Sequence, residues 1–136
     1  MKKIHKSLPI LLGFALVGLI IFITIRERSA SKQIMNINTS KVKDMTSTQS
    51  DSLLIVDVRE PFEYEAGHIP GSILIPLGDI PTFLNNLPKN KTILVVCRSG
   101  RRSLEAARLL AENGFEEVLN YEGGMLEWDG NIEYGL

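Results

Sequence analysis

The residue with the clearest chemical potential is Cys97, the single cysteine in a chain of 136 residues. It follows an apolar run, residues 92–96, that predicts a buried strand, and it precedes residues 104–111, whose apolar spacing predicts a helix. A turn of this kind points successive backbone N–H groups and the positive end of the helix at one spot. Those dipoles and three flanking arginines stabilise a thiolate, so we expect the pKa of Cys97 to lie below its ordinary value of about 8.5. The pattern predicts a nucleophilic thiolate inside an anion-binding loop.

The cysteine loop, which we define as residues 97–103, resembles the active-site loop of the rhodanese family of sulfurtransferases. The likeness lies in the cysteine that opens the loop, in Gly100 three positions later, and in an Arg-Ser pair that leads into a helix. Parts of residues 56–71 and of residues 123–128 fit the same family. Together the three motifs cover roughly residues 33–130.

The resemblance implies a reaction and a set of roles. A member of this family takes a sulfane sulfur from a donor such as thiosulfate, holds it on the cysteine as a persulfide, and passes it to a thiol or cyanide acceptor. Cys97 is then the nucleophile, the backbone N–H groups of residues 98–103 form an anion nest, and the arginines recruit and orient a small anionic donor. The predicted substrate-binding residues are Arg98, Ser99, Gly100, Arg101, Arg102 and Ser103.

A single cysteine also limits the chemistry. It excludes a disulfide within the chain and a cysteine-rich zinc site. We expect no metal and no cofactor. A sulfur relay needs a second thiol from outside the chain, such as the cysteine of a partner protein.

Two other functions stay open at this point. The first alternative is a cysteine-dependent phosphatase or arsenate reductase. Enzymes of this kind carry an arginine six positions after the cysteine, and that arginine binds the oxygens of phosphate. Here that position is Ser103, and arginines stand at four and five positions. A shorter loop suits a single sulfur atom, which favours sulfur transfer. The second alternative is a non-enzymatic docking module, although docking domains that resemble rhodanese commonly lack the cysteine.

Four residues outside the loop are candidates for supporting roles. Asp57 and Arg59 stand where the apolar run 53–58 ends, at the edge where parallel sheets place their ligands. We interpret them as an ion pair or turn cap that shapes the site rather than as groups that react. His68 has no context for pairing with a thiol, and Trp128 is interpreted as an aromatic core anchor, so both are predicted to be structural.

Charge is divided unevenly along the chain. Residues 1–32 contain six Lys or Arg against one Glu, a net charge of +5, whereas residues 33–136 contain nine against fifteen Asp or Glu, a net charge of -6. An acidic domain argues against nucleic acid as a partner. Within it, a local positive cluster that attracts an anionic substrate is expected around the cysteine loop. This cluster consists of Arg98, Arg101, Arg102 and Arg108.

The start of the chain predicts a single-pass membrane anchor. After a basic N-terminus, residues 1–6, no residue from 7 to 25 is charged, which is long enough for one transmembrane helix. Residues 26–33 are predicted to be a polar linker. The alternative is a cleaved signal peptide, but this apolar run is longer than usual and ends without a good small-residue cleavage site. Lys and Arg are nearly balanced on its two sides, so the positive-inside rule favours neither orientation.

Residues 34–136 are predicted to form a rhodanese-like domain. The predicted strands are residues 33–37, 53–58, 71–76, 92–96 and 117–121, and the predicted helices between or after them are residues 41–46, 60–67, 79–87, 103–113 and 123–128. This alternation predicts an α/β fold with a mainly parallel sheet of about five strands and helices on both faces. The resemblance implies the same fold.

Overall fold

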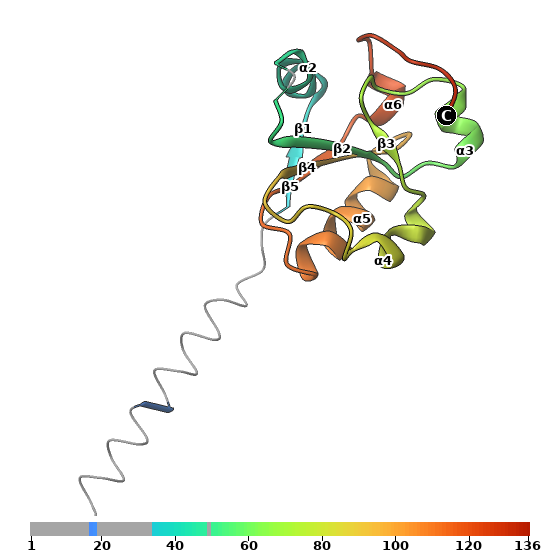
Figure 1. Cartoon of the computed structure of the whole chain (residues 1–136). Coiled ribbons are helices and arrows are strands. Elements are labelled where there is room, and N and C mark those ends of the chain that lie inside the picture. The colour runs from blue at the N-terminus through green and yellow to red at the C-terminus, as the bar shows by residue number, and fades with distance from the viewer. Residues whose placement is uncertain (1–16, 19–33, 49) are drawn as a thin grey trace, which may run out of the picture. The chain divides into compact units, whose positions relative to one another are not determined.

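A parallel sheet of five strands forms the centre of the unit that spans residues 33–136 (Figure 1). The computed structural model describes residues 17–18, 34–48 and 50–136, and the chain divides into two units, residues 1–32 and residues 33–136. Every neighbouring pair of strands is parallel, which confirms the predicted α/β sheet. The strands, in the spatial order β1-β5-β4-β2-β3, are β1 (Met35–Ile37), β5 (Val118–Tyr121), β4 (Thr92–Val96), β2 (Leu53–Asp57) and β3 (Ile73–Leu74).

The central strand β4 is buried on both faces because its apolar residues continue without interruption. Every residue from Ile93 to Val96 is buried. Side chains alternate between the two faces of a sheet, so an unbroken apolar run can serve both. Ile93 and Val95 pack into one core cluster, whereas Leu94 and Val96 pack into the other.

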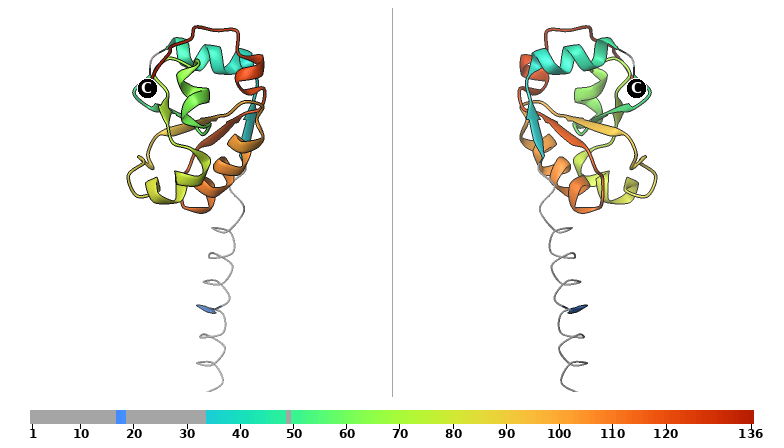
Figure 2. Two further views of the ribbon diagram at one scale, coloured as in Figure 1. Left: turned by 90° about the vertical axis from the view of Figure 1, so that its right-hand side faces the viewer. Right: turned by 90° about the vertical axis from the view of Figure 1, so that its left-hand side faces the viewer.

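Short helices cover both faces of the sheet (Figures 1 and 2). Helices α4 (Ile80–Phe83) and α5 (Arg101–Glu112) lie on one face, and α2 (Thr39–Ser47) and α6 (Gly124–Glu127) lie on the other. The remaining described helices are α3 (Pro61–Glu65) and the 3-10 helix η1 (Leu77–Asp79). Residues 79–87, predicted as one helix, are helical only through α4, because Asn85 and Asn86 follow it and asparagine favours turns over helix.

Helix α5 begins at Arg101, two residues before the predicted start at Ser103. Gly100 is its N-cap and adopts a left-handed conformation with a φ of 81°. The apolar periodicity that predicted this helix begins only at Leu104, so it carried no signal for the first turn. As a consequence, the last three residues of the cysteine loop belong to the helix.

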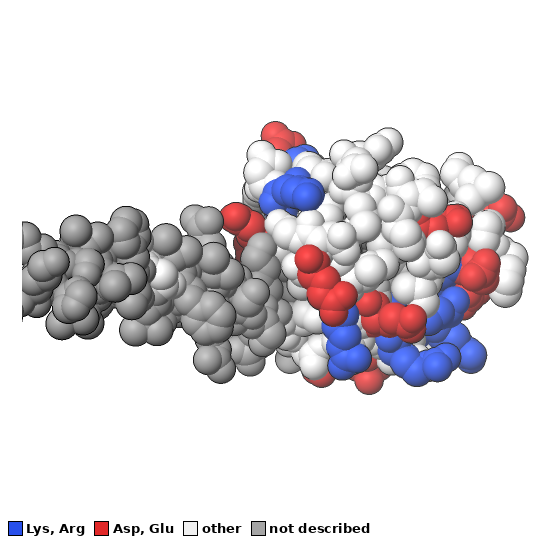
Figure 3. All heavy atoms as spheres, turned by 90° about the horizontal axis from the view of Figure 1, so that it is seen from below, with Lys and Arg blue, Asp and Glu red and all other residues white. Residues whose placement is uncertain are grey.

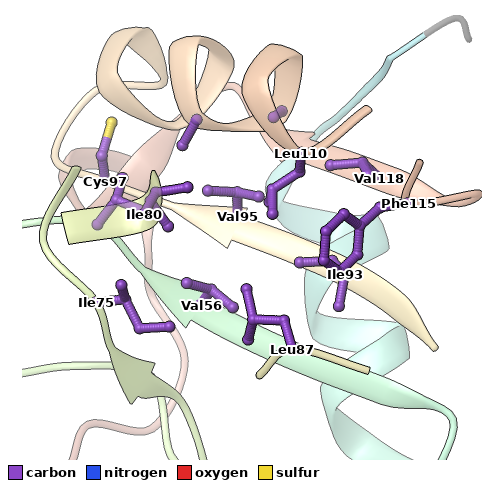
Figure 4. Packing of buried hydrophobic residues seen from close by; sticks show 13 residues of the cluster. Val56, Ile75, Ile80, Leu87, Ile93, Val95, Cys97, Leu110, Phe115 and Val118 are labelled. Carbon is purple, nitrogen blue, oxygen red and sulfur yellow. The ribbon is translucent and has the colours of Figure 1, made fainter. Parts of the chain in front are cut away.

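Cys97 lies at one end of the larger core cluster, which fills the space between the sheet and helices α4 and α5 (Figure 4). Leu87 and Phe115 lie at the other end of this cluster. The sulfur atom of Cys97 points away from the other labelled side chains (Figure 4). The second cluster lies against α2 and includes Val42 and Tyr121. The sulfur atom of Cys97 therefore lies at the margin of the core and not in its middle.

The membrane prediction concerns residues that the structure mostly does not describe. Apart from residues 17 and 18, the predicted span 7–25 lies outside the described residues, as do the basic N-terminus 1–6 and most of the linker 26–33. Among residues 17–18, 34–48 and 50–136, no helix is long and apolar enough to cross a bilayer. The anchor stays a prediction.

Candidate active site

The thiol of Cys97 is buried but holds polar partners. The residue follows β4 directly and only 1% of its surface is exposed. Its sulfur accepts a hydrogen bond of 3.3 Å from the hydroxyl of Ser103, which is itself fully buried in the first turn of α5. The side chain therefore contributes its carbon to the core while its sulfur faces the cysteine loop.

The surroundings of the sulfur favour its ionised form. Burial alone raises the pKa of the Cys97 thiol. The Ser103 hydroxyl and the backbone N–H groups of Ser103, Ser99 and Gly100 act in the opposite direction, and together they lower the pKa from its ordinary value. The direction of the predicted shift is confirmed. The dominant stabilising groups are hydrogen-bond donors of the loop rather than the arginine side chains.

Helix α6 holds the carbonyl side of the loop. The N–H of Met125 donates to the carbonyl of Cys97 at 2.9 Å, and the N–H of Leu126 donates to the carbonyl of Arg98 at 3.0 Å. A peptide group is planar, so its N–H and C=O point in opposite directions. The Arg98 carbonyl that α6 binds shares its peptide group with the N–H of Ser99, and this N–H is one of the donors to the sulfur.

Two glycines allow the backbones to approach this closely. Gly124 has a φ of 58°, and a Cβ atom there would lie 2.5 Å from the carbonyl carbon of Arg98. A Cβ atom on Gly100 would collide with the carbonyl of Glu122. Gly124 therefore passes directly against the backbone of the cysteine loop. The open side of Gly123 instead faces the side chain of Glu127.

Asp57 and Arg59 form a buried ion pair at the end of β2. The Arg59 guanidinium donates to both carboxylate oxygens of Asp57, at distances from 2.7 to 3.0 Å. It also donates to the backbone carbonyls of Glu63, at 3.0 Å, and of Gly67, at 2.8 Å. The middle of α3 and the turn that follows this helix are thereby attached to the end of β2. This arrangement agrees with the interpretation of the pair as a device that shapes the site.

Glu63, which the sequence did not mark as a site residue, binds the loop through Arg102. The guanidinium of Arg102 donates to both carboxylate oxygens of Glu63, at 2.7 and 2.8 Å. The pKa of Glu63 is lowered from 4.5 to about 2, chiefly by this hydrogen-bonded arginine. The two residues are 39 positions apart, so no local pattern connects them. The predicted role of Arg102 in orienting the donor stays a prediction, and its charge is already paired.

The other two arginines of the loop are open to solvent. Arg98 and Arg101 are exposed, as is Ser99 between them. Neither arginine forms a salt bridge within residues 34–48 and 50–136. On the face that α4 and α5 cover, Lys and Arg gather mainly at one side, next to Asp and Glu (Figure 3). The loop thus presents two unpaired positive charges on an acidic domain.

Comparison with known proteins agrees with this geometry. A family model described as a rhodanese-like domain matches residues 38–131. The chain belongs to this family. Within residues 34–48 and 50–136, no group of three His, Cys, Asp or Glu side chains is placed to hold a metal ion. The chemistry of this rhodanese-like protein is therefore considered below from Cys97 and the groups around it.

Several known proteins are similar to this domain in sequence or in structure. YtwF of Bacillus subtilis is 40% identical over 101 residues, which cover 74% of this chain and 96% of YtwF. YrkF of the same organism is 48% identical over 83 residues, and the match spans only 45% of YrkF. The thiosulfate sulfurtransferase of Pseudoalteromonas translucida is 38% identical over 79 residues, or 58% of this chain and 75% of that enzyme. A crystal structure of a rhodanese-like domain protein from Staphylococcus aureus superposes with a TM-score of 0.68 at 36% identity, covering 76% of this chain and 100% of that one.

His68 has structural contacts in the rhodanese-like domain. Its ring stacks on Tyr64 with centroids 3.6 Å apart, and its Nδ1 lies 2.9 Å from the Tyr64 carbonyl. Its backbone pairs with Glu133 in an isolated antiparallel bridge. These contacts attach α3 to the C-terminal segment. They are consistent with the interpretation of His68 as a structural residue.

Trp128 lies at the edge of the core rather than inside it. The indole is half-buried and meets Tyr121 edge-on, with centroids 6.3 Å apart. Its Nε1 donates to the carbonyl of Asn131 at 2.9 Å. Together with Met45 and Ile69 it lines a cleft of about 750 Å³, which does not include Cys97. Trp128, which was predicted to anchor the core, therefore lies at the rim of the second cluster. The large aromatic residue buried in that cluster is Tyr121.

Replacing Ser103 with alanine is expected to raise the pKa of Cys97, because the thiolate loses the hydroxyl that donates to it. Ultraviolet absorption of the thiolate, followed against pH, measures this pKa directly since the chain has one cysteine. Ser99→Ala is the matched control, because Ser99 acts through its backbone N–H, which alanine retains. Equal titration curves for Ser103→Ala and the unaltered protein would contradict the assignment.

Glu63→Gln is expected to lower the free energy of unfolding at neutral pH by about 1–3 kcal/mol, because Arg102 is left partly buried without its charged partner. The folded-state pKa of Glu63 is depressed, so its carboxylate stabilises the fold above 4.5 and loses this effect as the pH falls toward 2.

Urea unfolding at a series of pH values measures both effects. The difference in free energy of unfolding between the unaltered protein and Glu63→Gln is expected to become smaller below about pH 4.5. Glu65→Gln, an exposed position on the same helix, is the control and is expected to change stability little. A difference that stays constant down to the acid limit would show that the ion pair does not stabilise the fold in this way.

Proposed function

We propose that the protein moves a sulfane sulfur from thiosulfate or a persulfide donor to a thiol or cyanide acceptor through a persulfide on Cys97. One observation carries this proposal: the buried sulfur receives the Ser103 hydroxyl and three backbone N–H groups, and its pKa is lowered. The same donors stabilise negative charge on this sulfur, both when the thiolate attacks a donor and when it leaves in the second transfer, because they converge on it. The thiosulfate sulfurtransferase of Pseudoalteromonas translucida, a relative of this chain, supports thiosulfate as a donor.

The reaction has two sulfur-transfer steps. In the first, the Cys97 thiolate attacks the outer sulfur of thiosulfate, a sulfur–sulfur bond forms, and sulfite leaves with the electron pair of the broken bond. The exposed Arg98 and Arg101 are placed to attract the anionic donor. In the second, an acceptor thiolate or cyanide attacks the terminal sulfur and the Cys97 thiolate leaves. The product is a persulfide of the acceptor thiol, or thiocyanate when cyanide is the acceptor, and the electron pair of the broken sulfur–sulfur bond stays on Cys97.

The position of Ser103 argues against phosphatase or arsenate reductase chemistry. In such enzymes the sixth residue after the cysteine is an arginine, and it binds the oxygens of the oxyanion substrate. Here the sixth residue is Ser103, and its hydroxyl donates to the sulfur itself. Arg102, one position earlier, is bound to Glu63. The geometry therefore favours a sulfur carrier over an oxyanion clamp.

Exposure of the protein to thiosulfate is expected to add one sulfur atom, about 32 Da, to Cys97. Mass spectrometry detects this adduct, and dithiothreitol is expected to remove it. Cys97→Ser is expected to keep its fold, as judged by circular dichroism, and to lose both the adduct and all transfer to cyanide. Transfer that persists in this variant would disprove the role of Cys97. An unmodified thiol in the unaltered protein would leave a docking module as the function.

We further propose that residues 7–25 anchor the domain to a membrane. The support is the sequence alone: this segment has no charged residue and the length of one transmembrane helix.

The protein is expected to stay in the membrane fraction after alkaline carbonate extraction, whereas a variant with Leu16→Arg and Ile20→Arg is expected to be extracted. Release of the unaltered chain would contradict the anchor, and protease treatment of intact and lysed cells would show which side carries the domain.

A further inference from the structure

Glu63 and Arg102 form an ion pair next to the reactive sulfur. Both oxygens of the carboxylate are bound by the guanidinium, and one of them also accepts the backbone N–H of Glu60 at 3.0 Å. The side chains are 17% and 25% exposed, so the pair is only partly screened by water. Such a geometry keeps the negative charge at one defined place.

The position of Glu63 is determined by the sheet. Its backbone carbonyl accepts a hydrogen bond from Arg59, which is itself bound to Asp57 at the end of β2. Arg102, on the other side of the pair, lies in the first turn of α5 directly before Ser103, whose hydroxyl contacts the sulfur. Glu63 therefore brings a negative charge from one element to the loop of another.

The carboxylate of Glu63 lowers the net positive charge that a sulfur donor meets at the cysteine loop. Of the three arginines in the cysteine loop, Arg98 and Arg101 are exposed and unpaired within the described domain, whereas Arg102 is neutralised by Glu63. The pKa of Arg102 is raised chiefly by its hydrogen bond to Glu63, and the Cys97 thiolate is close enough to raise it further. A charge at this distance also acts on an anion that approaches the sulfur, and its effect grows with the charge of that anion.

We propose that Glu63 is a specificity-determining residue: by neutralising Arg102, it weakens the binding of divalent donors relative to donors of lower charge. This inference rests on the proposed sulfur transfer through Cys97. It predicts a selectivity that depends on donor charge and not on donor shape alone. Thiosulfate, a dianion, and methanethiosulfonate, a monoanion, are matched probes, because each offers a sulfane sulfur bound to a sulfonyl group.

The experiment uses the full chain in detergent, a saturating concentration of dithiothreitol as acceptor, and four proteins. These are the unaltered protein, Glu63→Gln, Arg102→Gln, and the double variant. Glu63→Gln leaves Arg102 unpaired and is expected to lower the KM for thiosulfate by about three- to tenfold, with a smaller decrease for methanethiosulfonate. Arg102→Gln leaves Glu63 unpaired and is expected to raise the KM for both donors, with the larger increase for thiosulfate.

The double variant separates charge from structure. It lacks the ion pair but has the same net charge as the unaltered protein at this place, so the ratio of kcat/KM for the two donors is expected to return to the original value. In about 0.5 M salt the differences among the four ratios are expected to shrink, because mobile ions screen the charges. A role of Glu63 in stability alone would lower kcat in all variants without moving this ratio.

The outcomes are distinguishable. Opposite shifts of the donor ratio in the two single variants support the proposal, and a ratio that stays unchanged in every folded variant overturns it. If Glu63→Gln fails to fold, Arg102→Gln alone decides, because the proposal requires its thiosulfate preference to fall. If the unaltered protein takes no sulfur from either donor, the proposed function itself is wrong.

Discussion

The site depends on the direction in which a few peptide groups point. A buried thiolate is costly unless hydrogen-bond donors surround it, and most of the donors here belong to the main chain. Main-chain N–H groups face the sulfur only if their carbonyls find partners on the opposite side. Helix α6 supplies those partners for Cys97 and Arg98, and it reaches them because Gly124 has no side chain to collide with the loop.

A second constraint is the placement of charge. The sheet end at Asp57 holds Arg59, Arg59 holds the backbone of α3, and α3 presents Glu63 to the first turn of α5. These contacts connect β2 to the helix that carries the Ser103 hydroxyl. Buried or partly buried ion pairs add little net stability when desolvation is counted, yet they define one arrangement of the groups involved. In this domain, that arrangement decides which arginines remain available to an anion.

Much of the fold was predictable because it rests on local patterns. The apolar run 92–96 is the central strand as predicted. The predictions from sequence were wrong where the local pattern of residue types is weak. Helix α5 starts before its apolar periodicity does, and Trp128, although large and apolar, stands at the wall of a cleft. The Glu63–Arg102 pair was missed because surface charges carry no pattern that names a distant partner.

The sequence by itself determined the order of strands and helices and the placing of one cysteine at a strand-to-helix turn. Periodicity and residue type are local properties, and they survive in a linear chain. Only the tertiary structure decided that Arg102 is neutralised, that Ser103 donates to the sulfur, and that α6 binds the carbonyls of Cys97 and Arg98. The Glu63–Arg102 pair and the contacts of α6 join segments far apart in the chain. The contacts of α6 also use backbone atoms that every residue has, so residue type alone cannot specify them.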